Sequence, residues 1–304
     1  MNSPSLYLST KLRRIETRHA AELLMQRAGA AAAEWAATLA DDQNHPVLVL
    51  AGPGNNGGDA FEVARLLRER FFDVCLIFAA DPAKLPADAG AAYQRYIAAG
   101  GVTTDTIPED TRWSLIVDGL FGIGLTRAPE GRYAQWIMTA NQLAERDDCP
   151  LLALDCPSGL NADTGTALAP IIRATQTITF IAAKPGLFTA DGPDYCGEIR
   201  VASLDLDPAS ETPPDGQVLS LANFALRLKP RRNNTHKGSF GSAGILGGAK
   251  SMVGAAFLAG RAALKLGAGR VYLGMLDTEA PSVDLLQPEL MIRRADTLLQ
   301  ADLQ

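Results

Sequence analysis

The most polar glycine-rich stretch of the chain follows its first apolar run. "HPVLVL" leads directly into "AGPGNNGGDAF", in which residues 52–57 match the dinucleotide pattern G-x-G-x-x-G. Glycines after a buried strand let backbone N–H groups approach an anion, and the N-terminus of the next helix favours negative charge. Asn55, Asn56 and Asp59 add two amide oxygens and a carboxylate that this pattern does not require. The motif therefore indicates a ligand-binding loop, with a plain tight turn capped by Asp59 as the alternative.

Three later apolar runs also end in charged or hydroxyl side chains. Asp118 stands in "IVDGLFGIGLTR", Asp155 and Ser158 in "LLALDCPSGL", and Lys184 in "AAKPGL". The glycines after Asp118 leave the backbone bare for a close-fitting ligand or for carbonyl contacts to a cation. In the alternative interpretation, Asp118 and Asp155 form turns and Lys184 is a surface lysine before a turn.

Short apolar runs alternate with helical patterns along residues 1–207. The runs are typical of strands buried on both faces, and their alternation predicts a mostly parallel sheet covered by helices. We therefore expect a three-layer αβα, Rossmann-like sandwich. Gly29 either divides the first helix, which Ser9 or Thr10 would cap, or permits close packing. Strands are expected within 45–54, 73–80, 114–125, 150–160 and 175–187, an edge strand at 197–206, and helices at 9–40, 59–71, 85–101 and 132–146.

In a parallel sheet, loops at the carboxyl ends of neighbouring strands share one edge, where ligands bind. Asn56, Asp118 and Ser158 would then meet as hard oxygen donors around a cation, with Asp155 beside them as a proton carrier. A bound cation would offset the repulsion between the two carboxylates and help keep Asp118 ionised. The three histidines are scattered and no Cys/His set is present, so zinc is disfavoured.

Composition and charge restrict the classes of function. The 304 residues are 47% hydrophobic and 20% charged, as in folded proteins. A net charge of −6 favours neither nucleic acid nor an anionic membrane surface as a partner. No run approaches the roughly 18 apolar residues of a membrane span, and the N-terminus lacks a signal-peptide pattern. The four cysteines show no C-x-x-C spacing and no disulfide framework, so we expect a cytoplasmic protein.

The composition changes after residue 207. "DPASETPPDGQ" is rich in proline and acidic residues and predicts a linker, which we place at 208–229. Residues 242–276 follow a strand–helix–strand pattern with glycine-rich turns, which predicts one βαβ unit. The segment 230–304 has about 75 residues, few for an independent α/β domain. We expect it to be the beginning of a domain.

Together the motifs resemble the NAD(P)H-hydrate epimerase family (YjeF N-terminal domain). "MQRAG", "AGPGNNGGDAFEVARLL", "VDGLFGIGLTR", "LDCPSGLNADTG" and "TFIAAKPGL" occur in the family's order over most of residues 10–207. The later "THKGSFGSAGILGGAKSMVGAAFLAGRAALKLGAGRVYL" resembles the opening of the ADP-dependent NAD(P)H-hydrate dehydratase domain, which has a ribokinase-like fold. The resemblance implies the front part of a bifunctional nicotinamide nucleotide repair enzyme, with residues 1–207 as its epimerase domain.

The resemblance also implies a reaction and its residues. The R and S hydrates of NADH and NADPH would be interconverted, and a dehydratase would restore the S form using ADP or ATP. Potassium would be held by Asn56, Asp118 and Ser158, and Asp155 would carry the acid–base chemistry, with Lys184 as a secondary candidate for a supporting charge. A homodimer is implied, with the N-terminal helix region near the contact. Substrate contacts are implied for Asn55, Asn56, Gly57, Gly58 and Asp59, for Gly122, Ile123, Gly124, Leu125, Thr126, Arg127 and Ala128, and for Asp155.

The chain departs from the family's pattern in three places. Ala60 stands where the family commonly has glycine, which affects the loop geometry, and Cys156 replaces an aliphatic residue. We expect Cys156 to pack at a strand end, with a reactive thiol as the alternative. The catalytic aspartate and nucleotide site of the dehydratase would fall after Gln304, so we expect no dehydratase activity from this chain by itself. The apolar helix within 253–267 would then be partly uncovered.

Two other functions are open at this point. The G-x-G-x-x-G supports a nicotinamide-dependent oxidoreductase with Asp81 as its ribose-binding acid, although no convincing hydride-transfer pair is present. A related domain occurs in an mRNA-decapping scaffold protein, so a non-catalytic binding scaffold is the third interpretation. The presence of Asn56, Asp118, Asp155 and Ser158 favours the epimerase.

Overall fold

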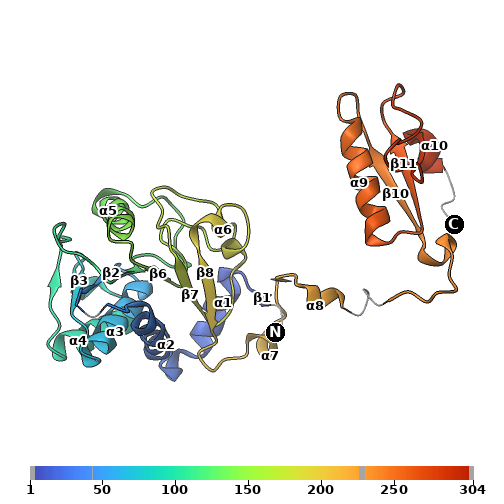
Figure 1. The fold of residues 1–304 in the computed structure, drawn as a ribbon. Helices are drawn as coiled ribbons and strands as arrows, with labels where there is room; N and C mark the ends of the chain where they lie inside the picture. The colour runs from blue at the N-terminus through green and yellow to red at the C-terminus, as the bar shows by residue number, and fades with distance from the viewer. Residues whose placement is uncertain (1–3, 43, 226–229, 301–304) are drawn as a thin grey trace. The chain divides into compact units, whose positions relative to one another are not determined.

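The computed structural model describes residues 4–42, 44–225 and 230–300, and the chain divides into two compact units after Phe224. The first unit contains a seven-stranded parallel sheet with the order β4-β3-β2-β5-β6-β7-β8 (Figure 1). The parallel sheet and the edge position of β8 confirm the sequence predictions. The strands are β2 Val47–Ala51, β3 Val74–Ile77, β4 Thr103–Thr104, β5 Leu115–Gly119, β6 Leu151–Leu154, β7 Gln176–Phe180 and β8 Glu198–Ala202.

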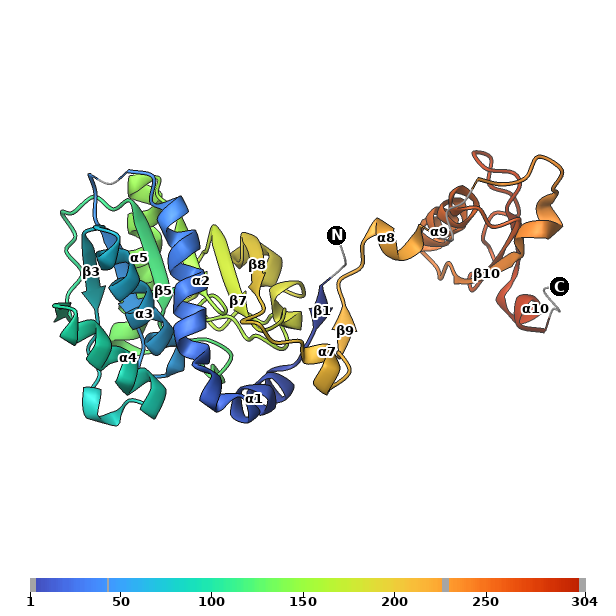
Figure 2. The same ribbon diagram turned by 90° about the horizontal axis from the view of Figure 1, so that it is seen from below.

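Helices cover both faces of this sheet, in the expected three-layer αβα arrangement (Figures 1 and 2). α2, α3 and α4 pack together on one face, and α5 lies on the other. Side chains alternate along β2, so that Val47 and Val49 face the first group while Leu48 and Leu50 pack with α5. The main helices are α1 Ser9–Arg18, α2 Leu24–Leu39, α3 Asn55–Glu69, α4 Ala87–Ala98 and α5 Gly131–Asp147, with the shorter α6 Gly192–Tyr195 and 3-10 turns η1 Ala20–Glu22, η2 Pro82–Lys84 and η3 Pro185–Leu187.

The prediction of one helix over residues 9–40 is wrong. The helix breaks between α1 and α2, where Leu23 adopts a left-handed backbone conformation with φ of 56°. Gly29 lies inside α2, and a Cβ at this position would lie 2.2 Å from the Glu62 Cβ of α3. Gly29 therefore permits close packing of α2 on α3, which is the second of its two expected roles.

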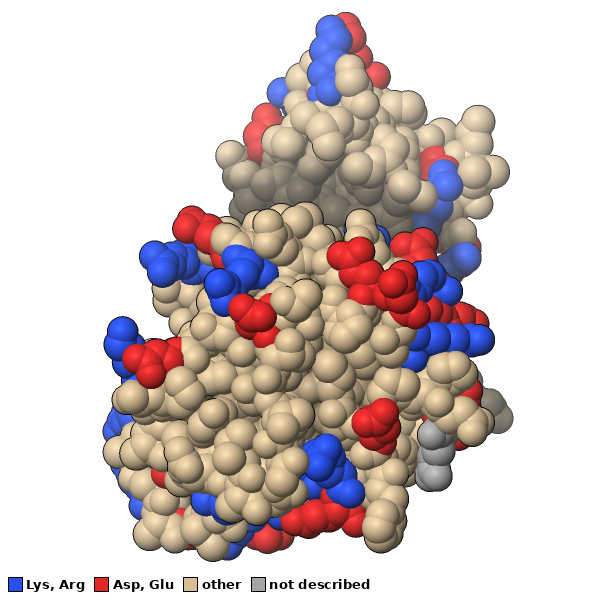
Figure 3. Space-filling model, turned by 90° about the vertical axis from the view of Figure 1, so that its left-hand side faces the viewer, with Lys and Arg blue, Asp and Glu red and all other residues tan. Residues whose placement is uncertain are grey.

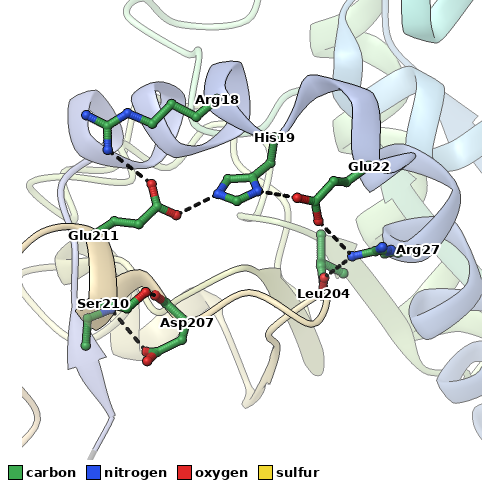
Figure 4. Close-up of polar contacts among 9 residues, drawn as sticks. Arg18, His19, Glu22, Arg27, Leu204, Asp207, Ser210 and Glu211 are labelled. Carbon is green, nitrogen blue, oxygen red and sulfur yellow. Dashed lines mark hydrogen bonds and ion pairs between the residues drawn. The ribbon is translucent and has the colours of Figure 1, made fainter.

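Contacts distant in sequence hold both ends of α1. Ser9 does not cap the helix; instead, its hydroxyl and its backbone N–H both donate to Asp163 Oδ1, each at 2.7 Å. At the other end, His19 lies between Glu22 and Glu211, with ring nitrogens 2.5 and 2.7 Å from their carboxylates (Figure 4). α1 is thus anchored by residues that follow it by more than 100 positions.

The segment after residue 207 pairs with the N-terminal segment, so it is not a free linker. β9 (Gly216–Gln217) pairs antiparallel with β1 (Ser5–Leu6), and Asp215 forms a 2.7 Å ion pair with Lys11. α7 (Pro208–Glu211) and α8 (Leu221–Phe224) complete this part of the first unit. The expected linker at 208–229 is therefore ordered up to Phe224, and its residues 226–229 lie outside the described part.

The second unit is small. β10 (Ser242–Gly247), α9 (Val253–Leu266) and β11 (Arg270–Met275) form the predicted parallel βαβ unit, and β12 (Met291–Arg294) adds a third parallel strand that was not predicted. The turn η4 (Lys237–Phe240) precedes this sheet and α10 (Ala295–Gln300) follows it. α9 leaves Leu258 and Leu266 exposed, so this helix is partly uncovered as expected.

The surface is mixed in charge on the face drawn in Figure 3. Acidic and basic side chains lie near one another there, in small groups separated by uncharged surface. Among the described helices, none combines the length and apolar character needed to cross a membrane.

Candidate active site

Four adjacent strands bring the sequence-predicted residues to one edge of the sheet. β2, β5, β6 and β7 are neighbours, so the loops that follow them meet beyond their carboxyl ends. Asp118 lies near the end of β5. Asn56 follows β2, Asp155 and Ser158 follow β6, and Lys184 follows β7. The sheet order therefore gathers side chains that are far apart in the sequence.

Asp118 is fully buried and joins the loops after β5 and β6. The Ser158 hydroxyl donates to Asp118 Oδ1 at 2.7 Å, and the Ser158 backbone N–H donates to Oδ2 at 2.8 Å. The Leu120 N–H adds a third hydrogen bond at 3.2 Å. Burial raises the pKa of Asp118 to about 6, although these hydrogen bonds oppose the shift. Ser158 Oγ also accepts from the Phe121 N–H at 2.9 Å, so the two loops form one hydrogen-bonded unit.

Asn56 is the second residue of α3, and its side-chain amide is buried without a protein partner. Neither Oδ1 nor Nδ2 makes a hydrogen bond, which costs a buried polar group roughly 1–3 kcal/mol. A Cβ placed on Gly122 would lie 3.2 Å from Asn56 Oδ1 and 2.9 Å from Asp155 Oδ2. Both side chains therefore face the same point of the glycine loop, and the unsatisfied amide is available to a ligand there.

Asp155 follows β6, and its Oδ2 faces this point of the glycine loop. Its backbone is left-handed, with φ of 65°, which is unfavourable for a residue that bears a Cβ. Oδ2 accepts from the Ile123 N–H at 3.2 Å, while Oδ1 lies 2.5 Å from Lys184 Nζ. Lys184 is 1% exposed, so it is not the surface lysine of the alternative interpretation.

Two further carboxylates lie within electrostatic reach of Asp155. Asp59 is buried in the second turn of α3, and burial, followed by the charge of Asp155, raises its pKa well above the ordinary value. Gly54 occupies the N-cap position of α3, so the interpretation of Asp59 as the helix cap is wrong. Burial and the nearby Asp155 also raise the pKa of Glu16 in α1. Three carboxyl groups thus lie close enough to influence one another's ionisation.

α1 contributes two residues that the sequence reasoning missed. Glu16 is the half-buried carboxylate just described, and Arg13 donates to the Ile123 carbonyl oxygen at 3.2 Å. A signal was present, because Glu16 stands four residues after Leu12 and next to Ile15, on the apolar side of this helix. Its charge on that side marks Glu16 as a candidate for the site.

The other predicted contact residues lie in the two glycine-containing loops. Asn55 is the exposed first residue of α3, and Gly57 and Gly58 are buried in its first turns. The loop 122–128 has neither helix nor strand, and its Gly124, Thr126 and Arg127 are exposed. Ile123, Leu125 and Ala128 of the same loop are half-buried.

Three residues bear on the oxidoreductase interpretation and on the two substitutions that depart from the family's pattern. Asp81, which the oxidoreductase interpretation needs, accepts from the Ala83 N–H and caps η2. Ala60 is buried with its Cβ toward Gly119, where a second Cβ would lie 2.5 Å away. The glycine opposite makes room for its methyl group. Cys156 is fully buried, and burial raises the pKa of its thiol well above the ordinary value, which favours packing over reactivity.

The donor set fits a hard cation. The unsatisfied Asn56 Oδ1, the Asp118 carboxylate and Ser158 are oxygen ligands of the type that such ions prefer. Throughout the described ranges, no group of three or more His, Cys, Asp or Glu side chains is arranged to hold a metal. Any cation here would therefore depend on amide and hydroxyl oxygens together with a single carboxylate.

Comparison with known proteins shows the family of the chain. Residues 21–186 match the family described as "YjeF-related protein N-terminus". The chain belongs to this YjeF-related family. The prediction made from the sequence motifs is therefore confirmed. The solved structure of the yeast protein YNL200c has a similar fold, with a TM-score of 0.52 and 17% sequence identity, covering 60% of this chain and 82% of that one.

Two relatives of this YjeF-related chain are more similar in sequence. An NAD(P)H-hydrate epimerase of Bordetella pertussis is 41% identical over 206 residues, which cover 66% of this chain and 88% of that protein. The bifunctional NAD(P)H-hydrate repair enzyme Nnr of Escherichia coli (strain K12) is 38% identical over 275 residues, which cover 88% of this chain and 52% of that protein. The chain thus spans about half the length of this bifunctional relative.

Proposed function

We propose that the first unit is an NAD(P)H-hydrate epimerase that interconverts the R and S hydrates of NADH and NADPH with potassium as its cation. The observation that carries the proposal is the meeting of Asn56, Asp118, Ser158 and Asp155 at one sheet edge. The likeness to the Bordetella pertussis enzyme, most of whose length the chain covers, supports the same reaction.

The nucleotide part of the substrate is proposed to lie against the two glycine-containing loops, Asn55–Asp59 and Gly122–Ala128. α3 begins after Gly54 without a side-chain cap, so the N–H groups of its first turn are available to the diphosphate. The exposed Arg127 stands in the second loop, where a guanidinium suits a phosphate group. The nicotinamide ring would then reach the point that Asn56 and Asp155 face.

Asp155 is proposed to move the proton of the hydroxyl group on the hydrated ring carbon. That carbon bears both the hydroxyl and the ring nitrogen, and its configuration inverts when one of these two bonds breaks and forms again from the other face. If the bond to nitrogen breaks, a group must take the hydroxyl proton as the carbonyl forms and return it when the ring closes. If the bond to oxygen breaks, the same group must give a proton to the leaving hydroxyl, which departs as water, and take one back from the water that adds to the other face. Asp155 Oδ2 is suited to this role because it faces the glycine loop, whereas Oδ1 is bound to Lys184.

Asn56, Asp118 and Ser158 are proposed to hold the potassium ion. When bound, the ion supplies positive charge that offsets the repulsion among Asp118, Asp155 and the anionic substrate. Asp118 is the only carboxylate in this ligand set, and its two hydrogen bonds from Ser158 fix its orientation. The Asn56 amide would gain the partner that the protein does not provide.

The test is conversion of purified R hydrate to S hydrate by the wild type and by Asp155→Asn, in potassium buffer. We expect the wild type to exceed the spontaneous rate and the variant to lose most of this excess. Wild-type conversion at the spontaneous rate would reject the proposal. Tight hydrate binding without turnover, unaffected by Asp155→Asn, would favour a binding scaffold, and substrate-dependent loss of reduced nicotinamide absorbance would favour an oxidoreductase.

The proposal also covers the oligomeric state of the chain and the second unit. The family resemblance implies a homodimer with the region around α1 near the contact, which sedimentation of the purified chain would test. The proposed epimerisation uses residues of the first unit only. Residues 230–304 resemble the opening of a dehydratase domain. We propose that the boundary between the two activities of a bifunctional relative lies just before the segment that corresponds to them.

A further inference from the structure

The ammonium group of Lys184 is fully occupied within the protein. Nζ lies 2.5 Å from Asp155 Oδ1, 2.7 Å from Thr179 Oγ1 and 2.9 Å from the Phe180 carbonyl oxygen. An ammonium has three N–H donors, so these three acceptors use all of them. Lys184 is also 1% exposed. It therefore has neither a free donor nor the access needed to bind a substrate.

The three acceptors place Lys184 behind Asp155, on the side away from the glycine loop. Oδ1 of Asp155 is turned to the ammonium, and Oδ2 is turned to the Ile123 N–H and to the space in front of Gly122. Because the Asp155 backbone is left-handed at φ of 65°, the direction of its side chain depends on contacts such as these. The ammonium decides which carboxylate oxygen faces the loop.

Lys184 is itself held by the N-terminal segment and by β7. Ala183, its neighbour in the chain, forms a parallel bridge with Leu6 and accepts from the Tyr7 N–H at 3.0 Å. Thr179 is a fully buried residue of β7, so the hydroxyl that Lys184 contacts is fixed by the sheet. The backbone next to Lys184 and the hydroxyl that its ammonium contacts are thus both held by the fold.

We propose that Lys184 is a positioning residue for the epimerase reaction, in which its ammonium fixes the Asp155 carboxylate so that Oδ2 faces the hydrated ring carbon. This inference rests on the proposed function of Asp155. In this proposal Lys184 contacts neither the substrate nor the cation. Loss of the ammonium should therefore slow turnover without weakening substrate binding.

The first test compares Lys184→Met with the wild type in R-to-S hydrate conversion. Methionine preserves most of the apolar stem, so the variant removes the charge and its three hydrogen bonds. We expect kcat to fall about 100-fold, as for a catalytic group displaced by about 1 Å, and KM to change less than about 3-fold. The matched control is Lys84→Met in η2, whose side chain is 84% exposed and which should keep both constants.

The second test addresses folding, because Lys184→Met leaves a buried carboxylate without its partner. Thr179→Val removes one acceptor of the ammonium while keeping the shape of the side chain, and Thr179→Ser keeps the hydroxyl. We expect kcat to fall roughly 5- to 10-fold in Thr179→Val, as for one hydrogen bond of about 1 kcal/mol, and to recover in Thr179→Ser. Equal kcat values in the two Thr179 variants would overturn the inference, as would a folded Lys184→Met with wild-type kcat or with a loss confined to KM. A wild type without epimerase activity would instead reject the proposed function itself.

Discussion

Ser158 binds both carboxylate oxygens of Asp118, one through its hydroxyl at 2.7 Å and the other through its backbone N–H at 2.8 Å. Asp118 belongs to β5 and Ser158 to the loop after β6, so this pair of residues joins a strand end to the loop that follows the neighbouring strand. A carboxylate fixed at both oxygens keeps its orientation without a ligand. This pair therefore holds the end of β5 and the loop after β6 in a fixed arrangement.

Ser158→Ala is expected to lower the free energy of unfolding by about 2 kcal/mol, because it removes a hydrogen bond from the fully buried Asp118 carboxylate. Urea unfolding in potassium-free buffer measures this loss. Ser210→Ala is the control, since the exposed Ser210 hydroxyl only contacts the nearby Asp207 carbonyl oxygen, and should change stability by less than about 0.5 kcal/mol. Similar losses in the two variants would show that the Ser158–Asp118 pair has no special role.

Asn56→Ala is expected not to lower stability in potassium-free buffer, because the buried amide has no protein partner to lose and its removal relieves the cost of an unsatisfied polar group. The potassium concentration that gives half of the maximal thermal stabilisation should rise at least about 10-fold. Asn55→Ala, at the exposed neighbouring position, should leave this concentration unchanged. An unaltered potassium response in Asn56→Ala would remove Asn56 from the cation site.

Gly122→Ala is expected to lower kcat at least about 10-fold, since its Cβ would lie 2.9 Å from Asp155 Oδ2 and must displace it. The comparison is Gly124→Ala two residues later in the same proposed binding loop, where the nearest atom to a Cβ is Arg13 Nη2 at 3.6 Å, an ordinary contact, so any effect should fall on KM and not on kcat. Steady-state hydrate conversion should separate the two variants clearly. If Gly122→Ala and Gly124→Ala behave alike, the space in front of Gly122 is not where the ring reacts.

The contact of His19 with two carboxylates predicts a pH-dependent stability. Hydrogen bonds first with Glu22 and then with Glu211 raise the pKa of His19 above its usual 6.5 (Figure 4). Because the folded-state pKa is the higher one, the stabilisation is complete below the ordinary pKa and is lost as pH rises through the raised value. The free energy of unfolding of wild type relative to His19→Gln should therefore be constant below about pH 6.5 and shrink as pH rises above it.

The same measurement on Glu211→Gln provides an internal control. This variant removes one of the two partners, so its pH dependence should be weaker than that of the wild type. Salt should also weaken the effect, because Arg18 and Arg27, which pair with the two glutamates, lie with them at the surface. Parallel stability curves for wild type and His19→Gln would contradict the prediction.

Local sequence patterns were sufficient to predict six of the seven strands in the sheet of the first unit, and they missed the two-residue edge strand β4 (Thr103–Thr104). The apolar runs "VLVL", "LIV" and "LLAL" became strands buried on both faces, and β8 took the edge position. Since loops after parallel strands share one edge, the meeting of Asp118 with Ser158 also follows from topology alone. These are features that short-range periodicity and strand order determine.

Such patterns could not predict contacts between segments that are distant in the sequence. The break at Leu23 was missed because its Ala- and Leu-rich surroundings favour a continuous helix, and only the anchoring of α1 explains it. β1 and β9 are two-residue strands more than 200 positions apart, too short to give a periodic signal. The burial of Lys184 beside Asp155 likewise depends on the N-terminal segment lying against Ala183.

The most direct test of the central claim is a crystal structure with thallium(I) in place of potassium and with NADPH hydrate bound. The predicted result is an anomalous peak among Asn56 Oδ1, Asp118 and Ser158, with the hydroxylated ring carbon facing Asp155 Oδ2. Hydrate bound away from the ends of β2, β5 and β6, with no anomalous peak at these side chains, would contradict the claim.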